Sequence, residues 1–435
     1  MTDRVTRILW LIYGIAMLIL SHIVHQYQFY ILAGLYILSF MIYFWMGTHR
    51  ALQDQVFDDR YLLILKILIV FAFPLASDDI YRFYWDGHST LAGISPYRYK
   101  PIDALTHVPP YVLDIYKHLN STAYFSVYPP ILQFLFACVA ALSFKSIYIF
   151  AILWKALLFL ADQATIKLLH RWLPDGQKHK TFWYAYNPLV LFEVLGNGHP
   201  EGLMIYLLMY TFYLLQRQQL HRSALYLGLA AAVKIFPIIL TLFFIKYLGL
   251  KKSIRFGFIA VGIFVLSILP IGPHYTHFLE SIGLYFKSFE FNGSVFEIWK
   301  AIDYQRLGYD NISQIGIYLS RIFIGCCGLI FLTQRHNDLK SLLKSCLFVW
   351  TGYLLLSTTV HPWYVIPVLF LGILAEHRWA AIWSCTVVLS YAWYDDRFTI
   401  TQRSGFILAE YILMLLIPLW INHRSLNKPK LQTFD

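Results

Sequence analysis

Two adjacent carboxylates, Asp78 and Asp79, begin the polar segment that follows the third apolar run of the sequence. Arg82 comes three or four positions later, so on a helix it would share a face with them. A carboxylate in this setting can act as a general base on a hydroxyl group, and a nearby cation can stabilise an anionic leaving group. An interfacial aromatic belt with a helix cap would explain the surrounding tyrosines, but not paired acids beside an arginine.

A second polar group surrounds a Gly/Pro break near residue 198. Glu193 is a carboxylate inside a short apolar run, and ionisable groups within membrane segments are costly and by default functional candidates. Asn197, His199 and Glu201 follow at the break itself. The alternative interpretation is a helix break with incidental polar residues.

Cations inside apolar runs form a third group. Lys155 and Asp162 are seven positions apart, so two helical turns return them to one face. They could form a structural ion pair as readily as a functional one. Lys234 precedes Pro237 within an apolar run, at a point where a helix would break. A cation at such a break suits an anion bound deep in a cavity.

The last group is a histidine at a break between two short apolar runs. His361 is followed by Pro362, Trp363 and Tyr364. A lone histidine is more often structural, but the aromatic neighbours could stack on a sugar ring. A base, cations and aromatic walls together indicate glycosyl transfer from a phosphate-linked sugar. Because no phosphate-binding loop or dinucleotide motif occurs in the sequence, we expect a lipid-linked donor rather than a nucleotide sugar.

The elements that hold these residues are predicted to be membrane helices. Of the 435 residues, 58% are apolar and 14% charged, and the mean hydropathy is +0.56. A soluble domain is nearer half apolar and a quarter charged. Many apolar runs approach the roughly 20 residues that cross a bilayer as a helix. We therefore predict one all-α, polytopic domain spanning 1–435, with roughly 11–13 membrane segments including re-entrant or broken helices.

The distribution of charge predicts the orientation. The net charge is +11, but it lies in short loops rather than in one block, which argues against a nucleic-acid partner. One set of loops, which includes both termini and 47–60, holds 20 Lys and Arg with 8 Asp and Glu. The other set, which includes the long loops 77–128 and 271–310, holds 9 and 13. The positive-inside rule makes the termini cytoplasmic and directs both long loops outward.

This orientation requires interrupted helices. The runs 129–144 and 146–169 lie between an outer and an inner loop, so one must dip and return or the two must form one bent span. The run 223–245 begins and ends on the inner side, which predicts two half-helices meeting near Lys234. Broken helices occur in membranes only where protein or a watery cavity covers the freed backbone. The sequence thus predicts a cavity that opens outward.

The segment SDDIYRFYWDGHSTLAGISPYRYKP, residues 77–101, resembles the first outer loop of integral-membrane glycosyltransferases of the GT-C superfamily. It is most similar to the bacterial mannosyltransferases that use polyprenyl-phosphate sugars. The later motifs follow in the order of that family across residues 77–364. They are Tyr128-Pro129-Pro130, Lys155…Asp162, Asn187…Glu193…Asn197-Gly198-His199, Lys234…Pro237 and His361-Pro362-Trp363-Tyr364.

Three positions depart from the family pattern. His88 replaces an arginine, Ser95 replaces an asparagine, and Pro200-Glu201 replaces Asn-Asp. The resemblance implies that an acid of the outer loop is the catalytic base and that the anomeric centre is inverted. Asp79 is favoured as that base because the family keeps the second acid of the pair. Asp78 is expected to support it.

The remaining expected roles divide between donor and acceptor. Four residues are candidates for the donor phosphate: Arg82, Lys155, Lys234 and His361. Ten more are candidates for contacts with the sugar or the acceptor: Tyr81, Trp85, Asp86, Tyr97, Glu193, Asn197, His199, Glu201, Trp363 and Tyr364.

The expected partners are a polyprenyl-phosphate sugar with mannose as the sugar, a glycan or glycolipid acceptor, and the lipid bilayer of a bacterial inner membrane. The sequence establishes no cofactor, and a divalent cation that bridges Asp79 and the donor phosphate is an open alternative. The rival interpretation is a transporter or flippase, since buried charges and broken helices occur there too. The sequence lacks the related halves and the short loops typical of transporters. A transferase of another group is the third alternative.

Overall fold

The computed structural model describes residues 2–48, 59–309, 311–334 and 337–426. Most of the chain in these ranges is helical, and none of it forms a strand, apart from an isolated bridge between Phe291 and Thr359. The all-α class is confirmed. Most of the predicted cytoplasmic loop 47–60 and the end of the C-terminal tail lie outside the described residues.

Six helical stretches are long and apolar enough to cross a membrane. Their outward faces carry large exposed apolar side chains such as Leu11, Leu266 and Leu329, which a bilayer would cover. The protein is therefore an integral membrane protein. The helices are α1 Thr2–His22, α2 Phe29–Thr48, α8 Ile147–Trp172, α13 Leu250–Ile268 with its continuation into α14 Tyr275–Lys287, α16 Ile312–Thr333 and α20 Ile400–Leu426.

Shorter helices fill the interior and build the loops. They are α4 Asp59–Val70, α5 Asp79–Leu91, α6 Pro110–Leu113, α7 Pro130–Leu142, α9 Phe182–Ala185, α10 Glu201–Gln216, α11 Leu220–Val233, α12 Phe244–Leu248, α15 Ser294–Leu307, α17 Leu339–Leu355, α18 Ile366–Leu374 and α19 Trp379–Thr386. Tighter or wider turns, labelled η, are η1 Pro101–Ala104, η2 Tyr116–His118, η3 Asp175–Thr181, η4 Val190–Gly196, η5 Phe236–Phe243, η6 Leu269–His274, η7 Pro362–Val365 and η8 Val387–Tyr394.

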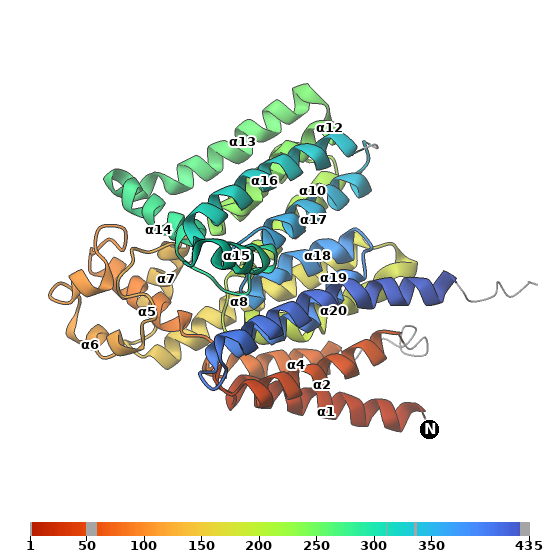
Figure 1. The fold of residues 1–435 in the computed structure, drawn as a ribbon, viewed down its shortest axis with the longest axis horizontal. Coiled ribbons are helices and arrows are strands. Elements are labelled where there is room, and N and C mark those ends of the chain that lie inside the picture. Colours follow the sequence, from red (N-terminus) through yellow and green to blue (C-terminus); the bar gives the residue numbers. More distant parts are fainter. Residues whose placement is uncertain (1, 49–58, 310, 335–336, 427–435) are drawn as a thin grey trace, which may run out of the picture.

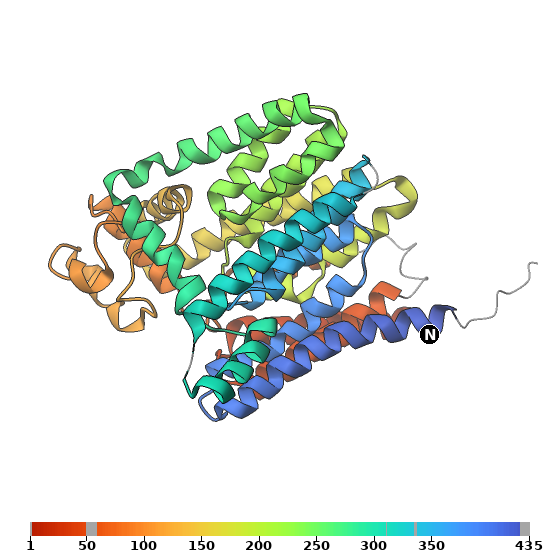
Figure 2. The ribbon, with the colours of Figure 1, turned by 45° about the horizontal axis from the view of Figure 1, so that its top comes forward.

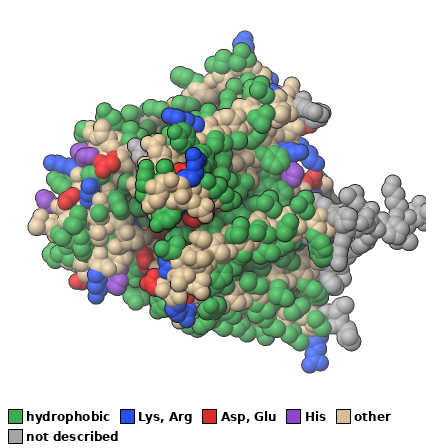
Figure 3. Space-filling view, viewed as in Figure 1, with side chains coloured by type: hydrophobic (Ala, Val, Ile, Leu, Met, Phe, Trp, Pro, Cys, Tyr) green, Lys and Arg blue, Asp and Glu red, His purple; other side chains and the backbone are tan. Residues whose placement is uncertain are grey.

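The two predicted outer loops lie at the same end of the molecule. Helices α5, α6 and α7 form a lobe at the end opposite the N-terminus and the end of α20 (Figure 1). Helices α14 and α15, from the second long loop, lie toward the lobe end in both views (Figures 1 and 2). Much of each loop is thus helical. Charged side chains gather over the lobe, while apolar ones dominate the long helices beside it (Figure 3).

Helix α7 accounts for the extra apolar run between residues 129 and 169. Its 13 residues extend about 20 Å, too short for a hydrocarbon core of about 30 Å. It packs against α5 instead of spanning. Gly87 of α5 permits this contact, since a Cβ there would lie 2.6 Å from the carbonyl oxygen of Phe136.

The predicted break near Lys234 is confirmed. Helix α11 ends at Val233, Lys234 has an extended backbone (φ −140°, ψ 126°), and η5 resumes at Phe236. Pro237 lies in the first turn of η5, where its missing N–H costs nothing. The break brings the Lys234 side chain to the cavity described next.

Candidate active site

A cavity of about 770 Å³ lies where α5, the start of α10, α14, α17 and η7 meet. It brings together nine of the residues that the sequence singled out, although they span almost 290 positions. They are Asp78, Asp79, Arg82, His199, Glu201, Lys234, His361, Trp363 and Tyr364.

The paired acids have different surroundings. Asp79 begins α5 and is 20% exposed. Its oxygens have only long contacts, 3.4 Å to Asn120 Nδ2 and 3.3 Å to the Tyr128 hydroxyl. Asp78 Oδ2 accepts a 2.8 Å hydrogen bond from Gln26 Nε2. Burial raises the pKa of Asp78 above its usual value against the lowering effect of Gln26, and the charge of Asp79 raises it further. Asp79 is thus the acid whose oxygens are free to take a proton.

Arg82 is held rigidly and keeps one nitrogen free. Its Nε donates to Asp86 Oδ1 at 2.8 Å, and Nη1 donates to the Ser121 carbonyl at 2.9 Å and to the Tyr124 carbonyl at 3.2 Å. The side chain is 4% exposed. Its Nη2 is buried and has no hydrogen-bond partner among the described residues. A buried N–H without a partner is costly, so this nitrogen is available to an anionic or polar substrate group.

Asp86 does not reach the cavity, which corrects the expectation that it contacts substrate. It is fully buried beneath Arg82. Its second oxygen, Oδ2, accepts hydrogen bonds from Ser126 Oγ at 2.6 Å and Gln133 Nε2 at 2.9 Å. These contacts satisfy the buried charge, so Asp86 fixes the position of Arg82.

Lys234 forms an ion pair within the cavity. Its Nζ lies 2.8 Å from Glu201 Oε1 and 5.0 Å from the centre of the Tyr364 ring. The lysine side chain is 27% exposed and Glu201 is 2% exposed. Glu201 therefore keeps an acid next to this lysine despite its departure from the family pattern. Glu201 occupies one of the N–H donors of the partly exposed Lys234, so the others can still bind a phosphate.

His361 reaches the cavity but does not supply a cation. Burial, followed by the charges of His199 and Lys234, lowers the pKa of His361 to about 3. Its ring lies parallel to Trp363 with 4.5 Å between centroids, and its Nδ1 is 3.5 Å from the Tyr394 hydroxyl. The expected cationic role is thus corrected. His361 can contribute only as a neutral hydrogen-bonding group.

Lys155 lies outside the cavity, contrary to the expectation that it binds the phosphate. It is fully buried, and its Nζ donates to the carbonyls of Ile69, Ala72 and Gly196. With three carbonyls as acceptors, the ammonium has no donor left for a ligand.

Asp162 does not pair with Lys155 either. Its Oδ2 lies 2.6 Å from Nζ of Lys66, and both side chains are 0% exposed. Lys66, a cation within an apolar run, is therefore enclosed in the protein rather than in contact with water. The ion pair joins α4 to α8 inside the bundle.

Glu193 and Asn197 also lie behind the cavity wall rather than on it. Both are buried. Glu193 accepts hydrogen bonds from the Tyr391 hydroxyl at 2.7 Å and from Asn197 Nδ2 at 3.0 Å. The expectation of direct substrate contact is corrected for both residues. Glu193 lies beside His199, whose Nδ1 is 3.1 Å from Glu193 Oε2.

Three aromatic residues of the first motif organise the lobe instead of lining the cavity. Tyr81 stacks on His118 with 4.8 Å between ring centroids, and Trp85 is buried near Tyr116. The Tyr97 hydroxyl donates to the Tyr128 carbonyl at 2.6 Å. Sugar contacts were expected for Tyr81, Trp85 and Tyr97, and these expectations are corrected.

The lobe also explains the departure at His88. Burial, followed by the charge of Lys145, lowers the pKa of His88 to about 4. The ring hydrogen-bonds to Tyr111 at 3.1 Å and to Ser143 at 3.4 Å. A neutral histidine thus occupies the position where the family has an arginine.

Several cavity residues were missed by the sequence analysis. Tyr128 belongs to the Tyr-Pro-Pro motif and was assigned no role at the site, yet its hydroxyl contacts Asp79. The second outer loop returns to the cavity through residues 289–291, where the Phe291 N–H and carbonyl pair with residues on either side of Thr359. No local motif in the sequence marks these residues as neighbours of the paired acids. They are Asn120, Ser121, Tyr124, Phe289, Phe291, Trp350 and Tyr353.

No set of three His, Cys, Asp or Glu side chains in the described part of the chain is arranged to hold a metal ion.

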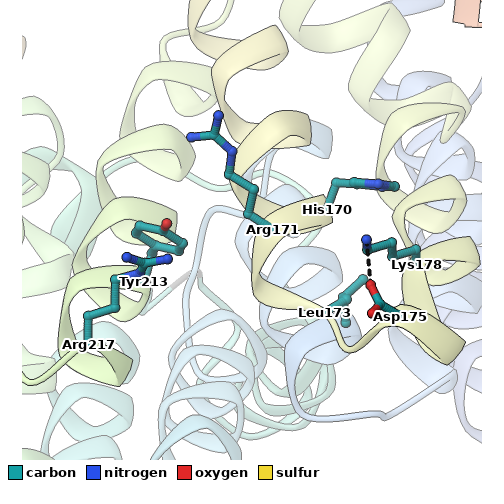
Figure 4. A pocket seen from close by; sticks show the side chains of 7 residues that line it. All are labelled: His170, Arg171, Leu173, Asp175, Lys178, Tyr213 and Arg217. Carbon is teal, nitrogen blue, oxygen red and sulfur yellow. Dashed lines mark ion pairs between the residues drawn. The ribbon is translucent and has the colours of Figure 1, made fainter.

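A second hollow, of about 550 Å³, belongs to the basic surface of the predicted cytoplasmic loops (Figure 4). An ion pair of 2.6 Å between Lys178 and Asp175 forms one wall, and Arg217 lies over the Tyr213 ring on another. It lacks the base and the apolar wall of the first cavity. Its lining residues are His170, Arg171, Leu173, Asp175, Lys178, Tyr213 and Arg217.

Comparison with known families gives one match. Residues 7–249, more than half of the chain, match the model of the alpha-(1->6)-mannopyranosyltransferase family, N-terminal domain. This region contains Asp78, Asp79, Arg82, His199 and Lys234. A search of curated proteins finds no match.

Proposed function

Because the chain belongs to the alpha-(1->6)-mannopyranosyltransferase family and is a mannosyltransferase, we propose that its cavity transfers mannose from a polyprenyl-phosphate donor to a glycan or glycolipid acceptor. The reaction occurs on the non-cytoplasmic face and inverts the anomeric carbon. The family name suggests that the acceptor hydroxyl is the 6-hydroxyl of a mannose and that the new linkage is α. Membership of an enzyme family removes the transporter alternative.

One observation carries this proposal: a free carboxylate and a buried guanidinium nitrogen without a partner share one cavity. Asp79 Oδ2 accepts the proton of the acceptor hydroxyl as the new C1–O bond forms. The bond between C1 and the phosphate oxygen breaks, and the lipid phosphate leaves with an additional negative charge. Arg82 Nη2 and Lys234 Nζ are the cations for that charge. A single displacement of this kind inverts the anomeric centre.

The apolar part of the cavity supports a lipid-linked donor. Ile235 and Phe236 follow Lys234 directly, and Trp350, Tyr353 and Leu354 of α17 line the same region. Phosphate-binding cations next to an apolar wall suit a phosphate that is esterified to an isoprenoid. A nucleotide sugar would need polar partners for its base and ribose in that place.

The charge distribution supports the outward orientation. The predicted inner loops carry 20 of the 35 Lys and Arg residues, and the α5–α7 lobe, which contributes Asp79 and Tyr128 to the cavity, lies opposite the N-terminus and the end of α20 (Figure 1). By the positive-inside rule, the lobe faces away from the cytoplasm of a bacterial inner membrane.

The test uses purified protein in detergent or vesicles with a panel of polyprenyl-phosphate sugars and a mannose-terminated acceptor. We expect release of free polyprenyl phosphate only with the mannose donor, and a product that NMR identifies as α-1,6-linked. Transfer from GDP-mannose without lipid donor would contradict the proposal. Equal release from a glucose-linked donor would contradict the choice of sugar.

A further inference from the structure

His199 lies between two carboxylates, one in the cavity and one behind it. Its Nε2 is 3.7 Å from Asp79 Oδ2 and 3.2 Å from Ser77 Oγ. Its Nδ1 is 3.1 Å from Glu193 Oε2 and 3.1 Å from the Glu193 carbonyl oxygen. Since both neighbours of Nδ1 are acceptors, Nδ1 must carry a hydrogen, whatever the charge of the ring. Glu193 therefore fixes the tautomer that directs Nε2 toward Asp79.

The backbone around His199 is built to hold this position. Gly198 has a left-handed φ of +80°, and a Cβ there would lie 3.2 Å from Trp154 Cδ1. Trp154 Nε1 donates to the Gly198 carbonyl at 2.7 Å. Residues 190–196 form a π-helical turn, a feature often found at functional sites. His199 follows that turn, and its own N–H returns to the Glu193 carbonyl at 3.0 Å.

Glu193 is surrounded by hydrogen-bond donors. Three converge on its side chain: the Tyr391 hydroxyl, Asn197 Nδ2 and His199 Nδ1–H. This set of partners suits a group that accepts hydrogen bonds at both oxygens. A buried carboxylate is most stable when it has a cationic partner, which a charged His199 can provide.

Trp363 favours the same charged form. The imidazole of His199 stacks on the indole with 3.5 Å between centroids and 15° between planes. The face of a tryptophan ring attracts a cation. An imidazolium at His199 would thus have a carboxylate on one edge and an aromatic face above it. Other charged or titratable groups of this neighbourhood are Asp78, Lys155, His361, the Lys234–Glu201 pair and the Arg82–Asp86 pair.

We propose that Asp79, His199 and Glu193 form a proton relay for glycosyl transfer, an inference that rests on the proposed function. Asp79 takes the proton of the acceptor hydroxyl and passes it to His199 Nε2. The imidazolium that forms keeps Nδ1–H on Glu193, and the proton is later released to water in the cavity. The distance of 3.7 Å shortens when substrate fills the cavity, as catalytic contacts often do. Only Asp79 touches the substrate; His199 and Glu193 are positioning residues that act through it.

The kinetic test compares Glu193→Gln, His199→Gln and the double variant. We expect kcat to fall about 100-fold in each single variant, within the range of general acid–base catalysis. KM for the donor should change little, since neither residue carries the phosphate. The double variant should be no worse than the worse single one, because both changes disable the same relay. Additive losses, or losses confined to KM, would overturn the relay.

Two matched variants separate a relay from simple packing. Ser384→Ala removes a buried hydrogen bond to Asn187 in the same helical core without touching His199, and should retain wild-type kcat. Tyr391→Phe removes one donor from Glu193 but keeps its charge, so its loss of kcat should be smaller than that of Glu193→Gln. If Ser384→Ala, Tyr391→Phe and Glu193→Gln all lowered kcat equally, the cluster would only stabilise the fold.

A spectroscopic measurement of His199 needs no sugar donor. With ¹⁵N-histidine labelling, the signal of His199 is identified by its absence in His199→Gln. The wild-type protein should show a protonated Nδ1. In Glu193→Gln the backbone carbonyl of residue 193 remains as an acceptor, so the Nδ1–H signal should persist but shift, because the carboxylate beside it is gone. A wild-type Nδ1 without hydrogen would overturn the relay even if mannosyl transfer is confirmed. A protonated Nδ1 in a protein that uses no lipid-linked donor would leave the hydrogen-bond assignment standing and refute the proposed function instead.

Discussion

At the scale of single residues, neighbours in sequence have separate tasks. Asp78 is tied to Gln26 and has a raised pKa through burial, whereas Asp79 faces the cavity with weak contacts. Arg82 and Lys155 show the same contrast among the cations. Arg82 has a free buried nitrogen, and Lys155 donates to carbonyls. The number of unsatisfied donors and acceptors, rather than charge alone, identifies the groups that can act on a ligand.

Asp79→Asn should therefore lower the rate of transfer about 10²–10⁴-fold, because an amide cannot accept the proton. The protein should stay folded. Asp78→Asn should lose less, since Asp78 acts from beside the base. The measurement is the rate of polyprenyl-phosphate release by purified variants with matched melting temperatures. A larger loss at Asp78 would reverse the assignment within the pair.

Arg82→Gln and Lys234→Met should lower kcat/KM for the lipid donor while the acceptor KM barely moves, because both cations act on the leaving phosphate. A two-substrate titration on folded variants measures this. Lys178→Gln, which removes a cation from the second hollow, is the matched control and should behave like wild type. Changes only in acceptor KM would mean that the phosphate binds elsewhere.

At the scale of elements, buried polar contacts fix how the helices are rotated against each other. The Lys66–Asp162 ion pair joins α4 to α8, and the hydrogen bonds of Asp86 join α5 to α7 and the preceding loop. Between helices in a membrane there is little hydrophobic driving force, so packing and such polar contacts specify the arrangement. The shape of the cavity depends on these contacts between helices, because α5 carries both Asp79 and Arg82.

Lys66→Met alone should destabilise the protein by about 3–5 kcal/mol, because it leaves Asp162 as an uncompensated buried charge. Lys66→Met combined with Asp162→Leu should recover much of that loss, since the double variant buries no charge. Thermal or denaturant unfolding in detergent provides the comparison. If the double variant is as unstable as the sum of both single changes, the ion pair itself is what the fold requires.

At the scale of the whole molecule, the α5–α7 lobe lies at the end opposite the N-terminus and the end of α20 (Figure 1). Cysteines at Thr106 and Ala301, exposed positions of the two outer loops, should react with an impermeant reagent added to intact spheroplasts. A cysteine at the exposed Gln216 should react only after lysis. The background should lack the five native cysteines. Labelling of only the Gln216 cysteine in intact spheroplasts would show that the orientation is the reverse of the predicted one. It would also contradict the choice of a lipid-linked donor.

The sequence by itself determined the helical membrane class, the break at Lys234 and nine of the residues that meet in the cavity. These features depend on local properties: the hydropathy of a run, the backbone limits of proline and glycine, and the cost of an ionisable group in an apolar segment. Asp79, Arg82, Lys234 and Trp363 could be selected on those grounds, and each lines the cavity.

Only the tertiary structure decided which polar groups are satisfied by the protein itself. Asp162 pairs with Lys66 instead of Lys155, and Glu193 supports His199 from behind the cavity wall. Tyr128, at the far end of the same outer loop, reaches Asp79 across 49 positions of the chain. Such partners are far apart in the chain, and whether they meet depends on how each helix is rotated and tilted against its neighbours. That rotation follows from the packing of whole faces, which spacing along a single segment does not encode.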